Sequence, residues 1–160
     1  MAPQKILFCT DFSENSEPAR ELAVEYAKAF GAKLLIIHVV DSSGFPSYAD
    51  WMLPSAADEL NQLLLRTQES AETRLGALSR ECSQGIKEVK TFCKIGLAPK
   101  EIVSLAEKES VDLIVVGTHG RTGVKHLVMG SIARSVLKTA HRPVLIVEAP
   151  TGEGESSEGR

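Results

Sequence analysis

The chain has 160 residues, of which 43% are hydrophobic and 24% charged, and its formal net charge is −3. This length suits one domain with a sizeable core, and the slightly acidic balance gives no general attraction to nucleic acid or anionic membranes. The apolar runs are too short to span a bilayer, and no signal-peptide pattern follows Met1. We therefore expect a cytoplasmic protein that has neither a nucleic acid nor a membrane as partner.

Short apolar runs alternate with helical patterns along the chain. The apolar runs predict strands, and the 3.6-residue periodicities predict helices; in chain order these are a strand at 5–9, a helix at 13–30, a strand at 33–40, a helix at 56–82, a strand at 87–95, a helix at 99–110, a strand at 112–117, a helix at 131–140 and a strand at 143–148. Ser13 or Ser16 can cap the first helix, which Gly31 is expected to end.

This alternation predicts a fold of the α/β class with parallel strands joined by right-handed crossovers. Four of the five runs are continuously apolar, as expected when helices cover both faces of a sheet. The run at 87–95 instead alternates charged and apolar residues, which predicts a sheet edge. We expect one domain over residues 1–149 and a disordered tail over 150–160, since Thr151 to Arg160 contains no apolar residue.

The cysteines and histidines do not indicate a metal or redox centre. Cys9, Cys82 and Cys93 are odd in number and far apart in sequence, which argues against a disulfide framework and against a CxxC site. The four histidines lack the spacing of zinc ligands. We therefore predict buried, unpaired cysteines and no metal ligands from the protein.

A glycine-rich segment follows the fourth predicted strand and reads GTHGRTGVKHLVMGS from Gly117 to Ser131. Gly117 and Gly120 allow a sharp turn and close approach of backbone N–H groups to a ligand. Gly130 and Ser131 open a helix whose first N–H groups lack partners and whose dipole attracts anions. The segment therefore predicts a phosphate-binding loop.

The charges around this loop agree with that prediction. Residues 113–147 contain no Asp or Glu, whereas Arg121 and Lys125 lie within the loop and three more cations follow it. His119 can also donate to a phosphate or stand as an ordinary surface residue. The loop has neither the P-loop pattern nor the GxGxxG pattern of dinucleotide-binding folds, and ordinary turn chemistry remains the alternative interpretation.

The spacing Gly117-x2-Gly120-x9-Gly130-Ser131 resembles the nucleotide-binding motif of the universal stress protein family. The segments CTDFS at 9–13, HVV at 38–40 and HRPVLIV at 141–147 also resemble that family, and the likeness covers roughly residues 3–149. It implies an open five-stranded parallel sheet in the order 3-2-1-4-5, of the adenine-nucleotide alpha-hydrolase-like type. It also implies a homodimer that pairs through the last strand, Pro143 to Glu148.

The resemblance further implies ATP, ADP or AMP as ligand, accompanied by Mg²⁺ or Mn²⁺. Asp11 would bind the ribose hydroxyls and Val39 would offer backbone groups to the adenine. Asp11 could equally cap the helix that follows it. The complete set of candidate nucleotide-binding residues is Thr10, Asp11, Val39, Gly117, Thr118, His119, Gly120, Arg121, Gly130 and Ser131.

Three functions fit this sequence. The first is a nucleotide-binding regulatory module of the stress response with little or no hydrolysis, because no general base is evident near the phosphate loop and Ser131 lacks a His–Asp partnership. The second is a slow ATPase or nucleotide-transfer enzyme. The third is a protein–protein adaptor that binds no nucleotide.

Overall fold

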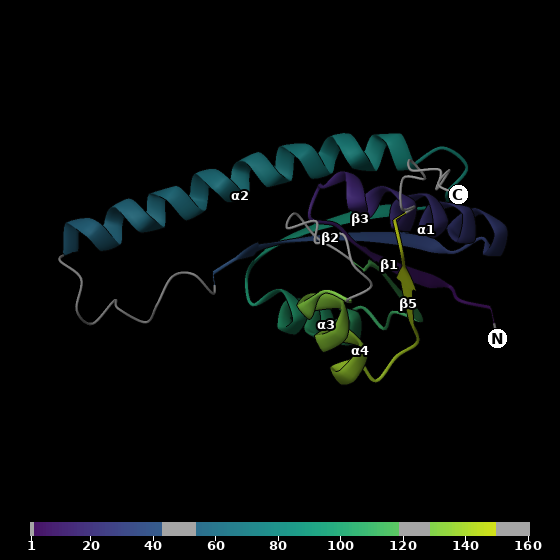
Figure 1. The fold of residues 1–160 in the computed structure, drawn as a ribbon. Helices are drawn as coiled ribbons and strands as arrows, with labels where there is room; N and C mark the ends of the chain where they lie inside the picture. The colour runs from purple at the N-terminus through teal and green to yellow at the C-terminus, as the bar shows by residue number, and fades with distance from the viewer. Residues whose placement is uncertain (1, 43–53, 119–128, 150–160) are drawn as a thin grey trace, which may run out of the picture.

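The computed structural model describes residues 2–42, 54–118 and 129–149. Within these ranges five strands form one parallel sheet in the order β3-β2-β1-β4-β5 (Figure 1). The predicted fold class and strand order are therefore confirmed, with both predicted edge strands at the edges. The strands are β1 (Lys5–Cys9), β2 (Lys33–Asp41), β3 (Val89–Gly96), β4 (Leu113–Gly117) and β5 (Val144–Val147).

Helices cover both faces of the sheet. Helices α1 and α2 pack on one face, and α3 and α4 pack on the other (Figure 1). The helices are α1 (Glu17–Phe30), α2 (Pro54–Cys82), α3 (Ala98–Lys108) and α4 (Ser131–Thr139).

The start of α1 differs from the predicted helix over 13–30. A short 3-10 turn, η1 (Glu14–Ser16), precedes the α-helix. Ser13 and Ser16 hold the N-cap positions of η1 and α1, as the sequence suggests, but neither side chain makes a capping hydrogen bond. Asp11 organises this turn instead. At the other end, Gly31 closes α1 with the left-handed φ of 63° that favours glycine.

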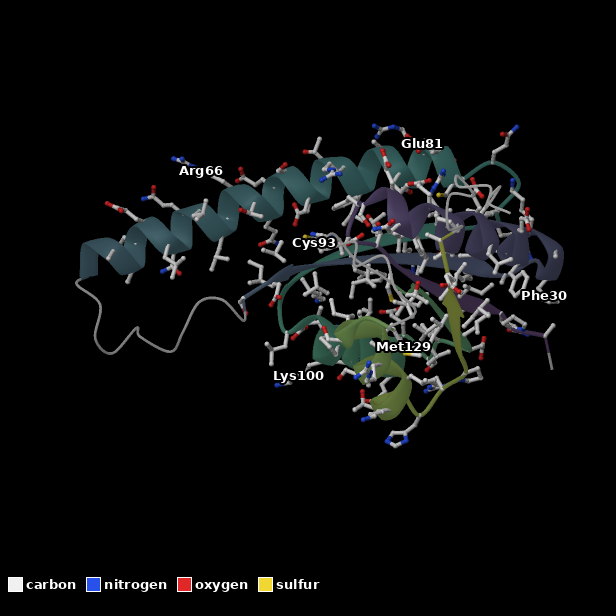
Figure 2. All side chains as sticks on the ribbon, in the orientation of Figure 1. Phe30, Arg66, Glu81, Cys93, Lys100 and Met129 are labelled. Atoms are coloured by element: carbon white, nitrogen blue, oxygen red, sulfur yellow. The ribbon has the colours of Figure 1, made fainter. Side chains whose placement is uncertain are left out.

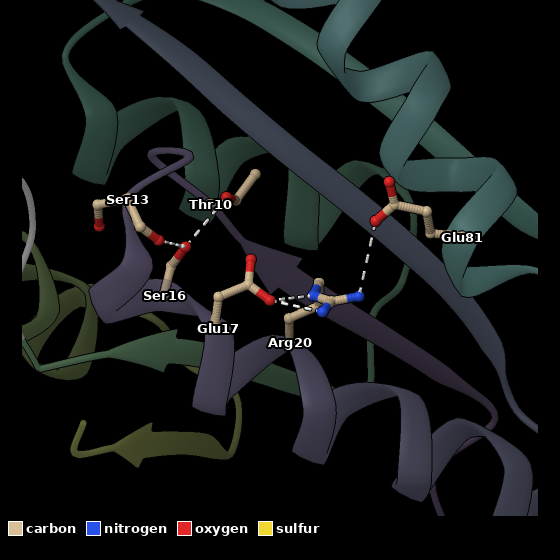
Figure 3. Close-up of polar contacts among 6 residues, drawn as sticks. All are labelled: Thr10, Ser13, Ser16, Glu17, Arg20 and Glu81. Atoms are coloured by element: carbon tan, nitrogen blue, oxygen red, sulfur yellow. Dashed lines mark hydrogen bonds and ion pairs between the residues drawn. The ribbon is translucent and has the colours of Figure 1, made fainter. Parts of the chain in front are cut away.

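The core lies in two layers, one on each side of the sheet. Alternate residues of β1 enter opposite layers, because successive side chains of a strand point to opposite faces. Ile6 and Phe8 pack with α1 and α2, whereas Leu7 packs with α3 and α4. Arg20 of α1 forms an ion pair with Glu17 at 2.5 Å and approaches Glu81 of α2 at 3.9 Å (Figure 3).

Only the C-terminal half of α2 is packed on the sheet. Its buried apolar residues are Ala71, Leu75 and Cys82, whereas Leu63 is 54% exposed. The N-terminal half extends beyond the end of the strands, where Arg66 lies in solvent (Figures 1 and 2). The apolar face of this helix is therefore buried only in its second half, and Leu60 and Leu64 in the first half are only half-buried.

All three cysteines are free, as predicted, and Cys9 and Cys82 are buried. Within the described residues no group of three or more His, Cys, Asp or Glu side chains could hold a metal ion. None of the helices described here has the length and apolar character needed to cross a membrane. The predicted tail at 150–160 lies outside the described residues.

Candidate functional site

A cavity of about 630 Å³ lies at the carboxyl ends of β1, β2 and β4. Strand β1 has β2 on one side and β4 on the other, so the strand order reverses at this point. Open parallel sheets bind ligands at such switch points, because the loops leave β1 and β4 in opposite directions and open a crevice between them. The first turns of α3 and α4 and part of α2 complete the lining.

Backbone hydrogen bonds bring the end of β4 and the start of α4 together at this cavity. Thr118 N–H donates to Val147 O at 2.9 Å, which extends the pairing of β4 with β5. Gly130 N–H donates to Thr118 O at 2.7 Å, and Gly130 O accepts the Arg134 N–H at 3.0 Å. Gly130 is thus the N-cap of α4 and closes the glycine-rich loop at its base.

The first turn of α4 faces the cavity with unpaired backbone donors. Ser131, Ile132 and Ala133 line the cavity, and the described part of the chain offers no hydrogen-bond partner to their N–H groups. The first turn of α4 contains no acidic residue. A helix start of this kind attracts an anion, because the N–H groups and the positive end of the helix dipole point the same way.

The turn after β1 forms the opposite wall. Asp11 Oδ1 accepts the Ser13 N–H at 3.0 Å and the Ser13 hydroxyl at 2.6 Å. Thr10 Oγ1 accepts the Phe12 N–H at 2.9 Å and lies 3.3 Å from Ser16 Oγ, which itself donates to Ser13 O (Figure 3). Asp11 therefore holds the turn before η1 and does not cap a helix, because the N-cap positions belong to Ser13 and Ser16. A carboxylate has about four acceptor sites, so this role leaves it capable of accepting ligand hydroxyls.

Strand β2 contributes its last residues to the same wall. His38 is only 8% exposed, and its Nδ1 lies 2.9 Å from Thr10 O. Because a carbonyl oxygen only accepts, Nδ1 carries the proton. Val39 lines the cavity, half-buried, on the face that packs with α3 and α4.

Cys9 contributes an apolar wall rather than a reactive thiol. It lines the cavity, and burial raises its pKa far above the ordinary value. A raised pKa favours the neutral thiol, which is a poor nucleophile.

The structure brings most of the predicted residues together. The members that line the cavity are Thr10, Asp11, Val39, Gly117, Thr118, Gly130 and Ser131. His119, Gly120 and Arg121 lie outside the described residues.

Sequence reasoning missed the residues that α2 and α3 contribute. Leu63, Leu64 and Thr67 reach the cavity because α2 extends past the strand ends, and Ala98 and Ile102 line it from α3. Their apolar periodicity indicates a packed helix face, and no local signal separates a face that packs on the sheet from one that borders a ligand cavity.

The model of the universal stress protein family matches residues 3–148 of the sequence. The chain belongs to the universal stress protein family. Universal stress protein MJ0531 of Methanocaldococcus jannaschii is 37% identical over 153 residues, which cover 94% of this chain and 85% of that protein. Its match covers almost the whole domain, so the family assignment does not rest on the glycine motif alone.

Solved structures agree with the assignment. The structure of protein MJ0577, from the same organism, superposes with a TM-score of 0.83 at 29% identity and covers 94% of this universal stress protein and 99% of its own chain. A universal stress protein from Archaeoglobus fulgidus, solved in complex with dAMP, shares the fold with a TM-score of 0.62 at 20% identity, covering 92% of this chain and 100% of that one.

Proposed function

We propose that this universal stress protein binds an adenine nucleotide, ATP, ADP or AMP, in the 630 Å³ cavity and acts in the cytoplasm as a nucleotide-responsive regulator of the stress response. The observation that carries the proposal is the first turn of α4, which lines the cavity, contains no acid and has N–H groups without a partner among the described residues. The dAMP complex of the Archaeoglobus fulgidus relative supports the ligand class.

The phosphates would lie at the start of α4. The Ser131 hydroxyl and the first-turn amides are the donors, and Gly117 and Thr118 border the same end of the cavity. Gly130 would act by leaving room for the phosphates, since its own N–H is already bonded to Thr118 O. His119, Gly120 and Arg121, in the adjoining loop, complete the proposed phosphate site.

The nucleoside would lie between the ends of β1 and β2. Thr10 and Asp11 would contact the ribose, with Asp11 accepting its hydroxyls, and Val39 would offer backbone groups to the adenine. Each of these residues lines the cavity. The apolar side chains of α2 and α3 supply the low-polarity wall that a purine ring prefers.

We further propose that Mg²⁺ or Mn²⁺ enters with the triphosphate, since the described residues hold no metal-binding cluster of their own. Hydrolysis is expected to be slow or absent. Among the described lining residues the acids are Asp11 and Asp41, both at the nucleoside end, so no carboxylate stands where it could activate water at the γ-phosphate. Steady ATP turnover, measured as ADP released and abolished by Ser131→Ala, would instead support the ATPase alternative.

Two serines of α4 provide a matched test. Ser131 lines the cavity, whereas Ser135, one turn later, does not. Because a hydrogen bond to a charged group contributes about 1.5–3 kcal/mol, Ser131→Ala should weaken ATP binding about tenfold or more in isothermal titration, and Ser135→Ala should leave it unchanged.

Gly130→Val should remove most of the ATP affinity, because the valine side chain would occupy the space of a phosphate.

Two outcomes would contradict the proposal. Absence of heat with ATP, ADP and AMP at millimolar concentration would favour the nucleotide-free adaptor. Equal ATP affinity of the wild type, Ser131→Ala and Gly130→Val would show that the phosphates bind elsewhere.

We also propose a homodimer that pairs along β5, the exposed edge of the sheet on that side. Val147 O accepts from Thr118, the residue after β4, so alternation along the strand turns the N–H groups of Val144 and Ile146 away from β4. Their hydrogen exchange should slow as protein concentration rises through the dimerisation range. Rapid exchange at every concentration, or sedimentation as a monomer, would contradict this edge pairing.

A further inference from the structure

An aromatic and cationic stack joins α2 to the turn after β1. The Phe12 and His38 rings lie 4.4 Å apart between centroids, and the guanidinium carbon of Arg74 lies 4.1 Å from the centroid of the Phe12 ring. Arg74 Nη2 also donates to Phe12 O at 3.4 Å. Three elements distant in sequence therefore meet in one column: α2, the β1–α1 turn and β2.

Phe12, the middle residue of this column, has a strained backbone conformation. Phe12 has a φ of 61°, a left-handed conformation that costs a non-glycine residue about 1–2 kcal/mol. Its N–H is held by Thr10 Oγ1 at 2.9 Å and its carbonyl by Arg74. The stack on one side and the hydrogen bonds on the other hold Phe12 in this conformation.

The column stands at the boundary of the proposed nucleotide site. A second hollow of about 350 Å³ lies beside it, lined by Phe12, Arg74 and their neighbours. His38 and Thr67 line both this hollow and the larger cavity. Because Asp11 precedes Phe12 directly, the backbone conformation of Phe12 affects where the Asp11 carboxylate lies.

The guanidinium of Arg74 suits this role better than other cations would. It is planar, so it can lie over a ring and donate to a carbonyl at once, which an ammonium group cannot do with the same geometry. Within the described residues Arg74 takes part in no ion pair. Among the same residues, its charged end lies over the Phe12 ring and donates to the Phe12 carbonyl, one residue from Asp11.

We propose that Arg74 is a positioning residue that, through Phe12 and His38, sets the Asp11 carboxylate for recognition of the ribose hydroxyls. This inference rests on the proposed nucleotide function. Helix α2 lies outside the glycine motif. Through Arg74 it would control whether the protein prefers ribonucleotides to nucleotides that lack ribose hydroxyls.

The test compares ATP with 2′,3′-dideoxy-ATP, which keeps the phosphates and the base but lacks the hydroxyls. In isothermal titration the wild type should bind ATP at least tenfold more tightly than the dideoxy analogue, because Asp11 accepts the hydroxyls. Arg74→Ala should weaken ATP binding about five- to tenfold and change the affinity for the dideoxy analogue less than twofold. Arg74→Lys should lie between, since it keeps the cation but loses the planar contact.

Arg80→Ala is the matched control, since Arg80 lies on the same helix and lines neither hollow. It should leave both affinities unchanged. The double variant Arg74→Ala/Asp11→Asn should lose no more discrimination than Asp11→Asn alone, because both residues act on the same hydroxyl contacts.

Each result discriminates. Equal losses for ATP and the dideoxy analogue in Arg74→Ala would show a general effect on the fold and overturn the positioning role, as would unchanged affinity for both. An Arg74→Lys variant that discriminates no better than Arg74→Ala, at an equal melting temperature, would also overturn it. A wild type that binds neither nucleotide would instead refute the proposed function, and the positioning role with it.

Discussion

Glu88 shows how a half-buried carboxylate is held at the sheet edge. It forms ion pairs with Lys33 of β2 and with Lys90 of β3, the latter at 3.0 Å. Hydrogen bonding from these two lysines lowers the pKa of Glu88 below its ordinary value. The charged network links the start of the edge strand to its neighbour and places charges on a strand edge that would otherwise invite pairing.

This pKa predicts a pH dependence. Because the pKa is lowered in the folded state, the contribution of Glu88 to stability is present above the ordinary glutamate pKa and is lost as the pH falls through the folded value. An NMR titration of the Glu88 carboxyl carbon should give a pKa that rises toward the ordinary value in Lys33→Met. Lys87→Met, which removes an adjacent lysine outside the ion pairs, should not move it; an equal shift in both variants would point to general charge effects.

Single residues differ in how far the sequence predicts their roles. Gly31 could be predicted as a helix end because the reason is local: the helical pattern stops and the residue after it tolerates a positive φ. The bond from Gly130 N–H to Thr118 O could not be predicted, since it depends on how the intervening loop closes. The Arg74–Phe12 contact joins residues 62 apart, and neither residue type indicates the other.

At the scale of elements, two glycines, one at the end of a helix and one inside a helix, affect stability in opposite ways. Gly31 has a φ of 63° at the C-cap of α1, and a Cβ there would meet no atom within 4 Å. Gly76 lies inside α2, where a Cβ would make an ordinary 3.7 Å contact with Arg80. Space is available at both positions, so the backbone alone decides the effect of a substitution.

We therefore expect alanine to act in opposite directions at these positions. Gly31→Ala should lower the free energy of unfolding by about 1–2 kcal/mol because of the left-handed backbone. Gly76→Ala should raise it by about 0.5–1 kcal/mol because alanine loses less entropy in a helix. Urea denaturation measures both, and destabilisation by both variants would show that packing rather than backbone conformation dominates.

Element boundaries were predictable where periodicity is strong and less so where side chains reorganise the backbone. The predicted strand at residues 5–9 coincides with β1, whereas α1 begins later than predicted because Asp11 draws the chain into the turn that becomes η1. The length of α2 was predicted, but its extension past the strands was not, since the apolar pattern continues through the half that leaves the sheet.

For the whole molecule, nucleotide binding should appear as added stability. A ligand at 100 times its dissociation constant stabilises the native state by about 2.7 kcal/mol, which for a domain of this size raises the melting temperature by roughly 5–10 °C. Differential scanning calorimetry with ATP should show this shift in the wild type, and Ser131→Ala should show about half of it at the same ATP concentration, because a tenfold weaker affinity leaves about 1.4 kcal/mol. An identical shift in both proteins would show that Ser131 does not contact the ligand.

The central position of β1 also bears on how the chain is made. During synthesis β1 emerges before both of its neighbours; it pairs with β2, which follows closely, and with β4, which begins only at Leu113. The carboxylate of Asp112 holds the N–H groups of Gln4 and Lys5 at 2.8 and 2.9 Å across a separation of more than a hundred residues. The strands β4 and β5 can therefore join the sheet only after residue 113 has been made. We expect the emerging chain to remain open along one side of β1 until then, and the domain to fold slowly for its length, since the pairing of β1 with β4 joins segments more than a hundred residues apart.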